Sequence, residues 1–331
     1  MKEVILTGIK PTGIAHIGNY LGAIKPAISM KSDENTDAYI FIADLHALNK
    51  IDSAQELKDN CLNIASTWLA CGLDPDKFVF YKQSLVPETC ELYSILTNVT
   101  AKGLMNRAHA YKAMVANNLE RNQDADDGVN MGLYNYPILM AADILLFNTK
   151  KVPIGQDQKQ HVEIARDIAK TFNKKYGYTL VVPNDVITEG VGTIEGLDGR
   201  KMSKSYGNTI PLFAKPEQLK KLISSIKTDS SLPTEPKSTD CTIFNLYKHF
   251  ATPEQIENLR KKFEKGIGWA EAKSELFEVM NNYLTPMREK YEYYISHPEV
   301  VNKYLEDGAK KARVVAKETI ERVKKAVGLI D

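Results

Sequence analysis

The sequence has few cysteines and no long apolar run. Its four cysteines form no Cys-x-x-Cys pair and have no histidine at zinc-finger spacing: Cys61, Cys71, Cys90 and Cys241. We therefore expect reduced thiols and no metal held by the protein itself. No apolar stretch approaches the roughly 20 residues that span a bilayer. The N-terminus resembles a strand rather than a signal peptide. We therefore expect a cytoplasmic protein with no membrane contact.

A strong net charge is also missing, because 43 basic side chains face 42 acidic ones. The charges are unevenly distributed. Residues 1–200 carry 20 basic and 24 acidic side chains, whereas residues 201–331 carry 23 and 18. Seven of the basic residues lie between Lys310 and Lys325, where Glu318 and Glu321 are the only acidic ones. A helix with this excess can follow a phosphate backbone, although a solvated helix face explains the pattern equally well.

The apolar pattern predicts an α/β fold. Short apolar strands at Val4–Gly8, Ala38–Ala43 and Phe78–Tyr81 alternate with helices, the clearest of which covers residues 53–70. This alternation indicates a parallel sheet joined by right-handed crossovers. We predict a doubly wound, Rossmann-like domain over residues 1–210, with a mostly helical insertion around 100–147. A helical C-terminal domain is expected over residues 211–331.

A lysine-rich stretch, Gly199–Asn208, is the strongest local signal. Lys201 and Lys204 are separated by Met202 and Ser203, and glycines flank the run. Glycines allow the backbone to bend, while hydroxyl and backbone N–H groups can solvate anionic oxygens. Such a loop suits a reaction that accumulates negative charge on phosphate oxygens. Taken alone, a solvated basic turn remains the alternative.

The first strand leads into a second candidate site. A loop with glycines follows it, and a helix is predicted to begin near Asn19. Strand, loop and helix N-terminus together form a corner that binds anions. Gly18 would let a nucleotide approach the backbone, and His16 can donate to a phosphate oxygen. A surface or capping histidine is the alternative.

Both stretches resemble the two signatures of class I aminoacyl-tRNA synthetases. The matching runs are Lys-Met-Ser-Lys-Ser at 201–205 and His-Ile-Gly-Asn at 16–19, the latter preceded by Pro-Thr-Gly. Most relatives have a second histidine where Asn19 stands. The resemblance implies that Lys201, Lys204 and His16 are catalytic. It also implies ATP contacts from Lys10, Pro11, Thr12, Gly18, Asn19, Ile194, Lys201, Met202, Ser203, Lys204 and Ser205.

The apolar stretch Tyr134–Leu146 predicts a helix with Pro137 in its first turn. Tyr136, Met140 and Asp143 share one face of this helix. A lone carboxylate among apolar residues needs a hydrogen-bond donor, either from a ligand N–H or from a neighbouring group of the protein.

This helix resembles the substrate helix of bacterial-type tryptophanyl-tRNA synthetases, in which the aspartate accepts the indole N–H. Tyrosine-specific relatives typically have glutamine at the position of Met140. The segment Gly155–His161 resembles the family's ribose and ammonium contacts, although many relatives have glutamate in place of Gln156. In the predicted helix after Gly103, many relatives have a further lysine in place of Met114. The resemblance implies further ATP contacts from Gly155, Gln156 and Asp157. It implies tryptophan contacts from Asp143, Met140, Tyr136, Leu6, His46, Gln158 and Ile154.

The resemblance implies a tryptophan–tRNA ligase that activates L-tryptophan with ATP and transfers it to tRNA(Trp). Mg²⁺ would accompany the ATP phosphates, the C-terminal helices would bind the anticodon, and the protein would be a homodimer that does not bind DNA. The alternatives are a tyrosine-specific synthetase, a small-molecule nucleotidyltransferase, and a synthetase-like regulator that binds tryptophan or RNA without catalysis. The departures at Asn19, Gln156 and Met114 keep the regulator open.

Overall fold

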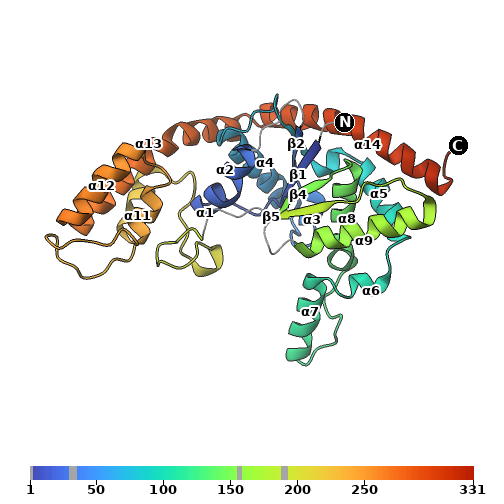
Figure 1. Ribbon diagram of the computed structural model, residues 1–331, viewed down its shortest axis with the longest axis horizontal. Coiled ribbons are helices and arrows are strands. Elements are labelled where there is room, and N and C mark those ends of the chain that lie inside the picture. The colour runs from blue at the N-terminus through green and yellow to red at the C-terminus, as the bar shows by residue number, and fades with distance from the viewer. Residues whose placement is uncertain (1–2, 30–35, 155–158, 188–192) are drawn as a thin grey trace.

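The computed structural model describes residues 3–29, 36–154, 159–187 and 193–331 (Figure 1). A parallel sheet of five strands, in the order β3-β2-β1-β4-β5, lies at its centre. This is a doubly wound arrangement, because strand order proceeds outward from β1 in both directions. The predicted fold class is confirmed. The strands are β1 (Glu3–Ile9), β2 (Thr36–Ile42), β3 (Val79–Lys82), β4 (Lys151–Ile154) and β5 (Asn184–Ile187).

Helices connect the strands and continue beyond the last of them. Before β5, η1 is a π-helical turn and η2 a 3-10 turn, and the others are α-helices. These elements are α1 (Ile17–Asn19), η1 (Tyr20–Ile24), α2 (Lys25–Ser29), α3 (Asp44–Ala47), α4 (Ala54–Ala70), η2 (Gln83–Leu85), α5 (Glu88–Thr97), α6 (Lys102–Met105), α7 (His109–Glu120), α8 (Met131–Leu146) and α9 (Lys159–Tyr176). After β5 come η4 (Lys204–Tyr206), α10 (Pro216–Ser224), α11 (Thr242–Tyr247), α12 (Pro253–Lys265), α13 (Trp269–Ser296) and α14 (Pro298–Val327).

Two apolar cores cover the two faces of the sheet. One contains side chains of α4 together with those of α10 to α13, for example Trp68, Leu219, Phe263 and Leu284. The other contains side chains of α5, α8, α9 and α14. Burial of these side chains supplies most of the driving force for folding. The sheet is thus enclosed on both faces, as parallel sheets usually are.

Two local predictions need correction. The first helix begins at Ile17 rather than near Asn19, because His16 caps it, and its continuation Tyr20–Ile24 is a π-helical turn. Such turns are common beside functional sites. The helix α8 begins at Met131, capped by Asn130, so Pro137 lies inside the helix and not in its first turn. The proline ring removes one intrahelical hydrogen bond there.

The C-terminal helix α14 runs back along the catalytic part of the chain, past β3 and α5 (Figure 1). Its residue Gly308 lies so close to β3 that an added Cβ would be 1.8 Å from the Phe80 carbonyl oxygen. Residues 210–212 also bond to residues 15–17, through Ile17 N to Ile210 O and Leu212 N to Ala15 O. The predicted domain boundary near residue 210 stays a prediction, because these contacts join the residues on its two sides.

Most of the basic side chains of α14 bind the protein itself. Arg313 pairs with the buried Glu88 of α5 at 2.9 Å, and Lys324 pairs with Glu91 at 2.8 Å. Three others also have intramolecular partners: Lys310 with Asp307, Lys311 with the Pro75 carbonyl, and Arg322 with Asn148 and the Thr179 carbonyl. Five of the seven basic residues singled out in the sequence therefore have intramolecular partners, and four of them (all but Lys310, whose partner Asp307 is on α14 itself) connect this helix to other elements.

Candidate active site

The corner after β1 is built around His16. Its Nδ1 accepts a hydrogen bond from the backbone N–H of Asn19 at 3.3 Å, and the Asn19 side chain accepts from the His16 backbone N–H at 3.1 Å. This reciprocal capping box satisfies two of the free N–H groups at the start of α1. His16 therefore combines the capping role that the sequence left open with a place in the candidate site.

The hydrogen bonds also determine the form of the His16 ring. Burial of the imidazole, and to a smaller extent the charge of Lys204, lower the pKa of His16 to about 4. The ring is therefore neutral at pH 7. Because Nδ1 accepts from Asn19, the proton is on Nε2. His16 can donate from this nitrogen to a phosphate oxygen without contributing a full positive charge.

The lysine loop lies against this corner. Met202 N donates to Ile194 O at 2.8 Å, and Met202 Sδ accepts from Gly18 N at 3.2 Å. A Cβ on Gly18 would lie 3.0 Å from the His16 ring and 3.4 Å from Met202 Cβ. A side chain at position 18 would therefore force the His16 ring or Met202 to shift, so glycine favours the close approach. The loop and the corner, nearly 200 residues apart in sequence, form one site.

A cavity of about 690 Å³ lies between the corner and the lysine loop. Its lining includes seven of the predicted residues: His16, Gly18, Asn19, Ile194, Lys201, Met202 and Ser203. Gly22, Thr193 and Tyr206 complete it, and the sequence reading missed them. Gly22 and Tyr206 lie beside the motifs and could have been included for that reason. Thr193 has no local pattern that marks it. Cationic and hydroxyl groups suit a polyphosphate ligand.

The remaining predicted ATP contacts lie beside this cavity or outside the described residues. Lys204 Nζ donates to Thr12 O at 2.9 Å, and the Ser205 and Ser203 hydroxyl oxygens are 2.8 Å apart. Lys10 and Pro11 continue the chain directly from β1, and Pro11 is buried. Gly155, Gln156, Asp157 and the predicted tryptophan contact Gln158 lie outside the described residues.

A second polar group of residues surrounds Asp143 on α8. Asp143 is 2% exposed. Its Oδ2 accepts from His46 Nε2 at 3.0 Å, and its two oxygens accept from Gln83 Nε2 at 2.8 and 3.0 Å. Burial raises the pKa of Asp143, and the hydrogen bonds from His46 and Gln83 oppose that rise. Oδ1, with one protein donor, retains a lone pair for a ligand N–H.

Gln83 was missed by the sequence reading. It is fully buried at the carboxyl end of β3, and its Oε1 has no hydrogen-bond partner among the described residues. The position itself gave a usable signal, since ligands bind at the carboxyl ends of strands in open α/β sheets. Asp44 follows β2 at the same edge, but its Oδ1 accepts from the backbone N–H groups of Leu45 and Ser84. The Asp44 carboxylate thus links the backbone of α3 to that of η2 at this edge.

Of the other predicted tryptophan contacts, Tyr136 lies beside this group. The ring of Tyr136 lies 6.4 Å from that of His46, edge to face. Met140 and Leu6 belong to the apolar core on the α8 side of the sheet, Leu6 fully buried and Met140 partly. The backbone of Ile154 ends β4, while its side chain lies outside the described part of the structure. An apolar wall with one carboxylate suits a flat aromatic ligand that carries an N–H donor.

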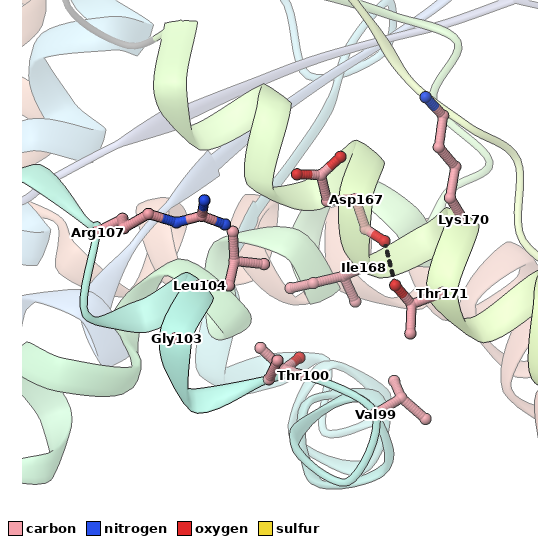
Figure 2. A pocket seen from close by; sticks show the side chains of 10 residues that line it. Val99, Thr100, Gly103, Leu104, Arg107, Asp167, Ile168, Lys170 and Thr171 are labelled. Atoms are coloured by element: carbon pink, nitrogen blue, oxygen red, sulfur yellow. Dashed lines mark hydrogen bonds between the residues drawn. The ribbon is translucent and has the colours of Figure 1, made fainter.

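A second cavity, of about 620 Å³, lies between residues 99–107 and α9 (Figure 2). Its charged side chains are Arg107, Asp167 and Lys170, and it contains none of the predicted site residues. Within the described residues, no group of three or more His, Cys, Asp or Glu side chains could hold a metal ion. The described lining of the 690 Å³ cavity presents one lysine, Lys201, together with hydroxyl groups and no carboxylate.

Comparison with known proteins identifies the class. Residues 2–285 match the family model of class I tRNA synthetases (W and Y). The chain belongs to this family and is an ATP-dependent aminoacyl-tRNA synthetase. The resemblance expected from the two signatures is confirmed.

Within the family, relatives that share about half of their residues with this chain are tryptophan–tRNA ligases. The enzyme of Pseudomonas aeruginosa is 51% identical over 99% of this chain and 74% of its own length. That of Xanthomonas campestris is 49% identical over 100% of this chain and 78% of its own length. The crystal structure of tryptophanyl-tRNA synthetase from Campylobacter jejuni, complexed with ADP and tryptophan, superposes with a TM-score of 0.89. It is 42% identical and covers 98% of this chain and 99% of its own. No described helix is long and apolar enough to cross a membrane.

Proposed function

We propose that the protein is a tryptophan–tRNA ligase whose adenylation site is the cavity between the His16 corner and the lysine loop. One observation carries the proposal: Lys204 and Lys201 belong to the loop that packs on this corner, and Lys204 Nζ bonds to the Thr12 carbonyl oxygen. The names of the similar enzymes supply the substrates: tryptophan, ATP and tRNA(Trp).

In the first step, the tryptophan carboxylate attacks the α-phosphorus of ATP, and pyrophosphate leaves. Lys201 and Lys204 neutralise the charge that develops on the phosphate oxygens, while His16 donates from Nε2. Asp143 accepts the indole N–H through Oδ1, and Tyr136 and Met140 wall the ring. The protein contributes orientation and charge rather than a covalent intermediate. Mg²⁺ enters as part of the substrate MgATP.

In the second step, a terminal ribose hydroxyl of tRNA(Trp) attacks the adenylate and takes the tryptophanyl group, releasing AMP. We assign anticodon binding to the C-terminal helices. The basic face of α14 is mostly occupied by intramolecular pairs, so the helical lobe of α11 to α13 is the more suitable surface. We also propose that the protein is a homodimer. It acts in the cytoplasm, where protein synthesis consumes the charged tRNA.

ATP–pyrophosphate exchange with each of the 20 amino acids supplied singly tests the proposal. Exchange with tryptophan alone is expected. Exchange with tyrosine alone would retain the ATP site and overturn the assignment of Asp143 and Met140. If folded protein gave no exchange with any amino acid, the regulator that binds without catalysis would replace the enzyme.

A further inference from the structure

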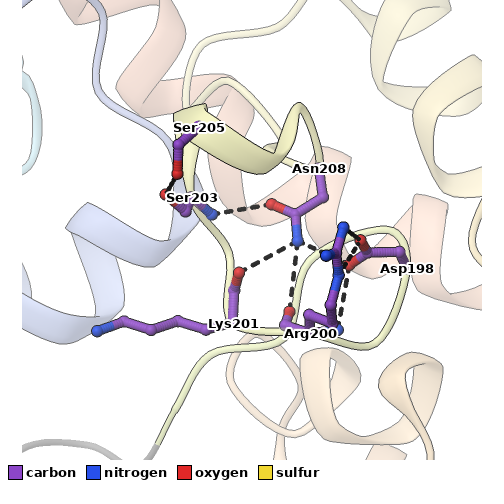
Figure 3. A network of polar contacts seen from close by, with 6 residues as sticks. All are labelled: Asp198, Arg200, Lys201, Ser203, Ser205 and Asn208. Atoms are coloured by element: carbon purple, nitrogen blue, oxygen red, sulfur yellow. Dashed lines mark hydrogen bonds and ion pairs between the residues drawn. The ribbon is translucent and has the colours of Figure 1, made fainter. Parts of the chain in front are cut away.

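Asn208 lies buried inside the lysine loop, at 3% exposure (Figure 3). The loop folds back on itself: Glu195 pairs with Lys201 in a short bridge, and Gly196 N donates to Arg200 O at 2.7 Å. The backbone of Asn208 also bonds to this folded segment, because its main-chain carbonyl oxygen accepts from Leu197 N at 3.0 Å. Its side chain therefore points into a small enclosed space bounded by the loop's own backbone.

The Asn208 amide binds the backbone on both sides of Met202. Its Oδ1 accepts from Ser203 N at 2.8 Å, and its Nδ2 donates to Lys201 O at 3.1 Å. One side chain thus determines the path of the chain through Lys201, Met202 and Ser203. Figure 3 shows the Lys201 side chain extending away from this network. The starting point of that side chain is set by the bond to Asn208, while its charged end stays available to a ligand.

Neighbouring charges hold the amide in this orientation. Asn208 Nδ2 also donates to Asp198 Oδ1 at 2.7 Å, and Asp198 Oδ2 pairs with Arg200 Nη2 at 2.6 Å. A carboxylate can only accept and Ser203 N can only donate, so the amide oxygen and nitrogen cannot exchange places. The hydrogen bond from Asn208 and the nearby Arg200 lower the pKa of Asp198 to about 2. Asp198 is therefore ionised at neutral pH.

The surroundings leave no room for another arrangement. A Cβ on Gly196 would lie 2.4 Å from the Asn208 side-chain carbon Cγ, so position 196 must lack a side chain for the amide to fit. On the opposite side, Met202 Sδ accepts from Gly18 N at 3.2 Å. A change in the path of residues 201–203 would therefore also shift the loop relative to the phosphate-binding corner.

We propose that Asn208 is a positioning residue, which holds the backbone of Lys201 and Ser203 so that the lysine loop meets the phosphates of ATP in the correct geometry. The proposal rests on the proposed adenylation function. Asn208 does not touch the substrate and acts through the loop. Misplacing a catalytic group by about 1 Å can cost about 10²-fold in rate.

The test compares Asn208→Ala with Asn173→Ala in ATP–pyrophosphate exchange. Asn173, near the end of α9, is a matched control, because its side chain likewise accepts from backbone N–H groups and donates to a carbonyl, here those of Thr179 and Leu180 in the loop after α9. For Asn208→Ala we expect kcat to fall by about 10- to 100-fold with an unchanged KM for tryptophan. For Asn173→Ala we expect unchanged kcat and a comparable loss of Tm. Equal kcat in the two variants would overturn the proposal.

A double substitution separates positioning from general destabilisation. In a Lys201→Ala background, removal of Asn208 should lower kcat by a smaller factor than in the wild type, because one of the side chains that depend on this backbone is already gone. The same fold loss of kcat in both backgrounds would mean that Asn208 does not act through Lys201, contrary to the proposal. If Asn208→Ala does not fold, Asn208→Ser, which retains a small donor and acceptor, takes its place in both comparisons. Wild-type protein without any exchange would instead refute the proposed function.

Discussion

Lys204 and Thr12 are 192 positions apart in sequence, yet Lys204 Nζ donates to the Thr12 carbonyl oxygen at 2.9 Å. Gly13, the residue after Thr12, has a φ of +62°, and a Cβ there would lie 3.3 Å from Lys204 Nζ. The lysine thus rests on the backbone of the phosphate-binding corner. On the proposed function, the ammonium group would exchange this neutral carbonyl for a charged phosphate oxygen of ATP, which is a stronger partner.

Replacement of this lysine should affect the rate more than the binding of tryptophan. For Lys204→Ala we expect kcat for ATP–pyrophosphate exchange to fall by about 10² to 10³, because the ammonium group stabilises charge that develops in the transition state. The KM for tryptophan should remain within about twofold of wild type. Lys221→Ala, at an exposed position of α10, serves as the control. Undiminished turnover of Lys204→Ala would remove this lysine from the mechanism.

Gln83→Met should weaken tryptophan recognition in a pH-dependent way. The substitution removes the amide that donates to both Asp143 oxygens, so the pKa of the buried Asp143 rises further. We expect kcat/KM for tryptophan to fall by about tenfold at pH 7.5, the scale of one hydrogen bond to a charged group. The loss should grow as the pH falls toward 6, since the protonated carboxyl is a poorer acceptor.

The control for that experiment is Gln55→Met, which removes an exposed amide bonded to Asp59. It should leave both kcat/KM and its pH profile unchanged. A Gln83→Met profile parallel to that of wild type would show that Gln83 does not act through the ionisation of Asp143.

The stability of the protein should depend on pH through His16. Its pKa in the folded state is about 4, below the ordinary value of 6.5, so the unfolded chain binds this proton more tightly. The contribution of His16 is complete above pH 6.5 and is lost as the pH falls toward 4. The pKa of His249 is also lowered, by burial and by Lys25, and acts in the same direction.

Urea denaturation at pH 7 and pH 4.5 measures this effect. In His16→Asn, the drop in the free energy of unfolding between the two pH values should be smaller than in wild type by on the order of 2 kcal/mol. Asparagine keeps a capping side chain at the start of α1. The same drop in both proteins would contradict a buried neutral imidazole.

The ion pair between Arg313 and Glu88 should stabilise the protein more than the pair between Lys324 and Glu91. Glu88 is 6% exposed, so Arg313→Ala leaves a buried carboxylate without its cation. We expect a loss of about 2–4 kcal/mol in the free energy of unfolding. Lys324→Ala removes a cation from the more exposed Glu91 and should cost at most about 1 kcal/mol. Equal losses in the two variants would mean that the burial of Glu88 does not matter.

Much of the fold was predictable because local patterns and packing agree. The strands near Val4, Ala38 and Phe78 and the helix after Ser53 all appear at the expected places, since their apolar spacing matches the cores they enter. The boundaries of α1 and α8 were wrong, because side-chain caps from His16 and Asn130 determine them. Histidine is uncommon as a capping residue. Pro137 is typical of a first helical turn but stands inside α8, which begins six residues earlier, directly after the capping Asn130.

The site was predictable where a motif carries the chemistry and was missed where only tertiary contacts do. His16, Lys201 and Lys204 stand in recognisable runs. Gln83 has no motif, and its role follows from the position of α8 relative to the end of β3. Asn208 stood at the end of the lysine stretch, but its function depends on Asp198, which orients the amide across the loop. Such pairings are not encoded in spacing along the chain.

The contact of Gly308 with Phe80 has a consequence for the solubility of the chain. The strand β3 is the outermost strand on its side of the sheet, and α14 lies directly against it. During synthesis, this helix of 30 residues emerges long after β3, so the strand remains uncovered while the intervening chain is made. An uncovered strand can pair with another chain. Loss of α14, or a bulkier residue at position 308, should therefore appear first as aggregation of newly made protein, before any deficit in tRNA charging can be measured.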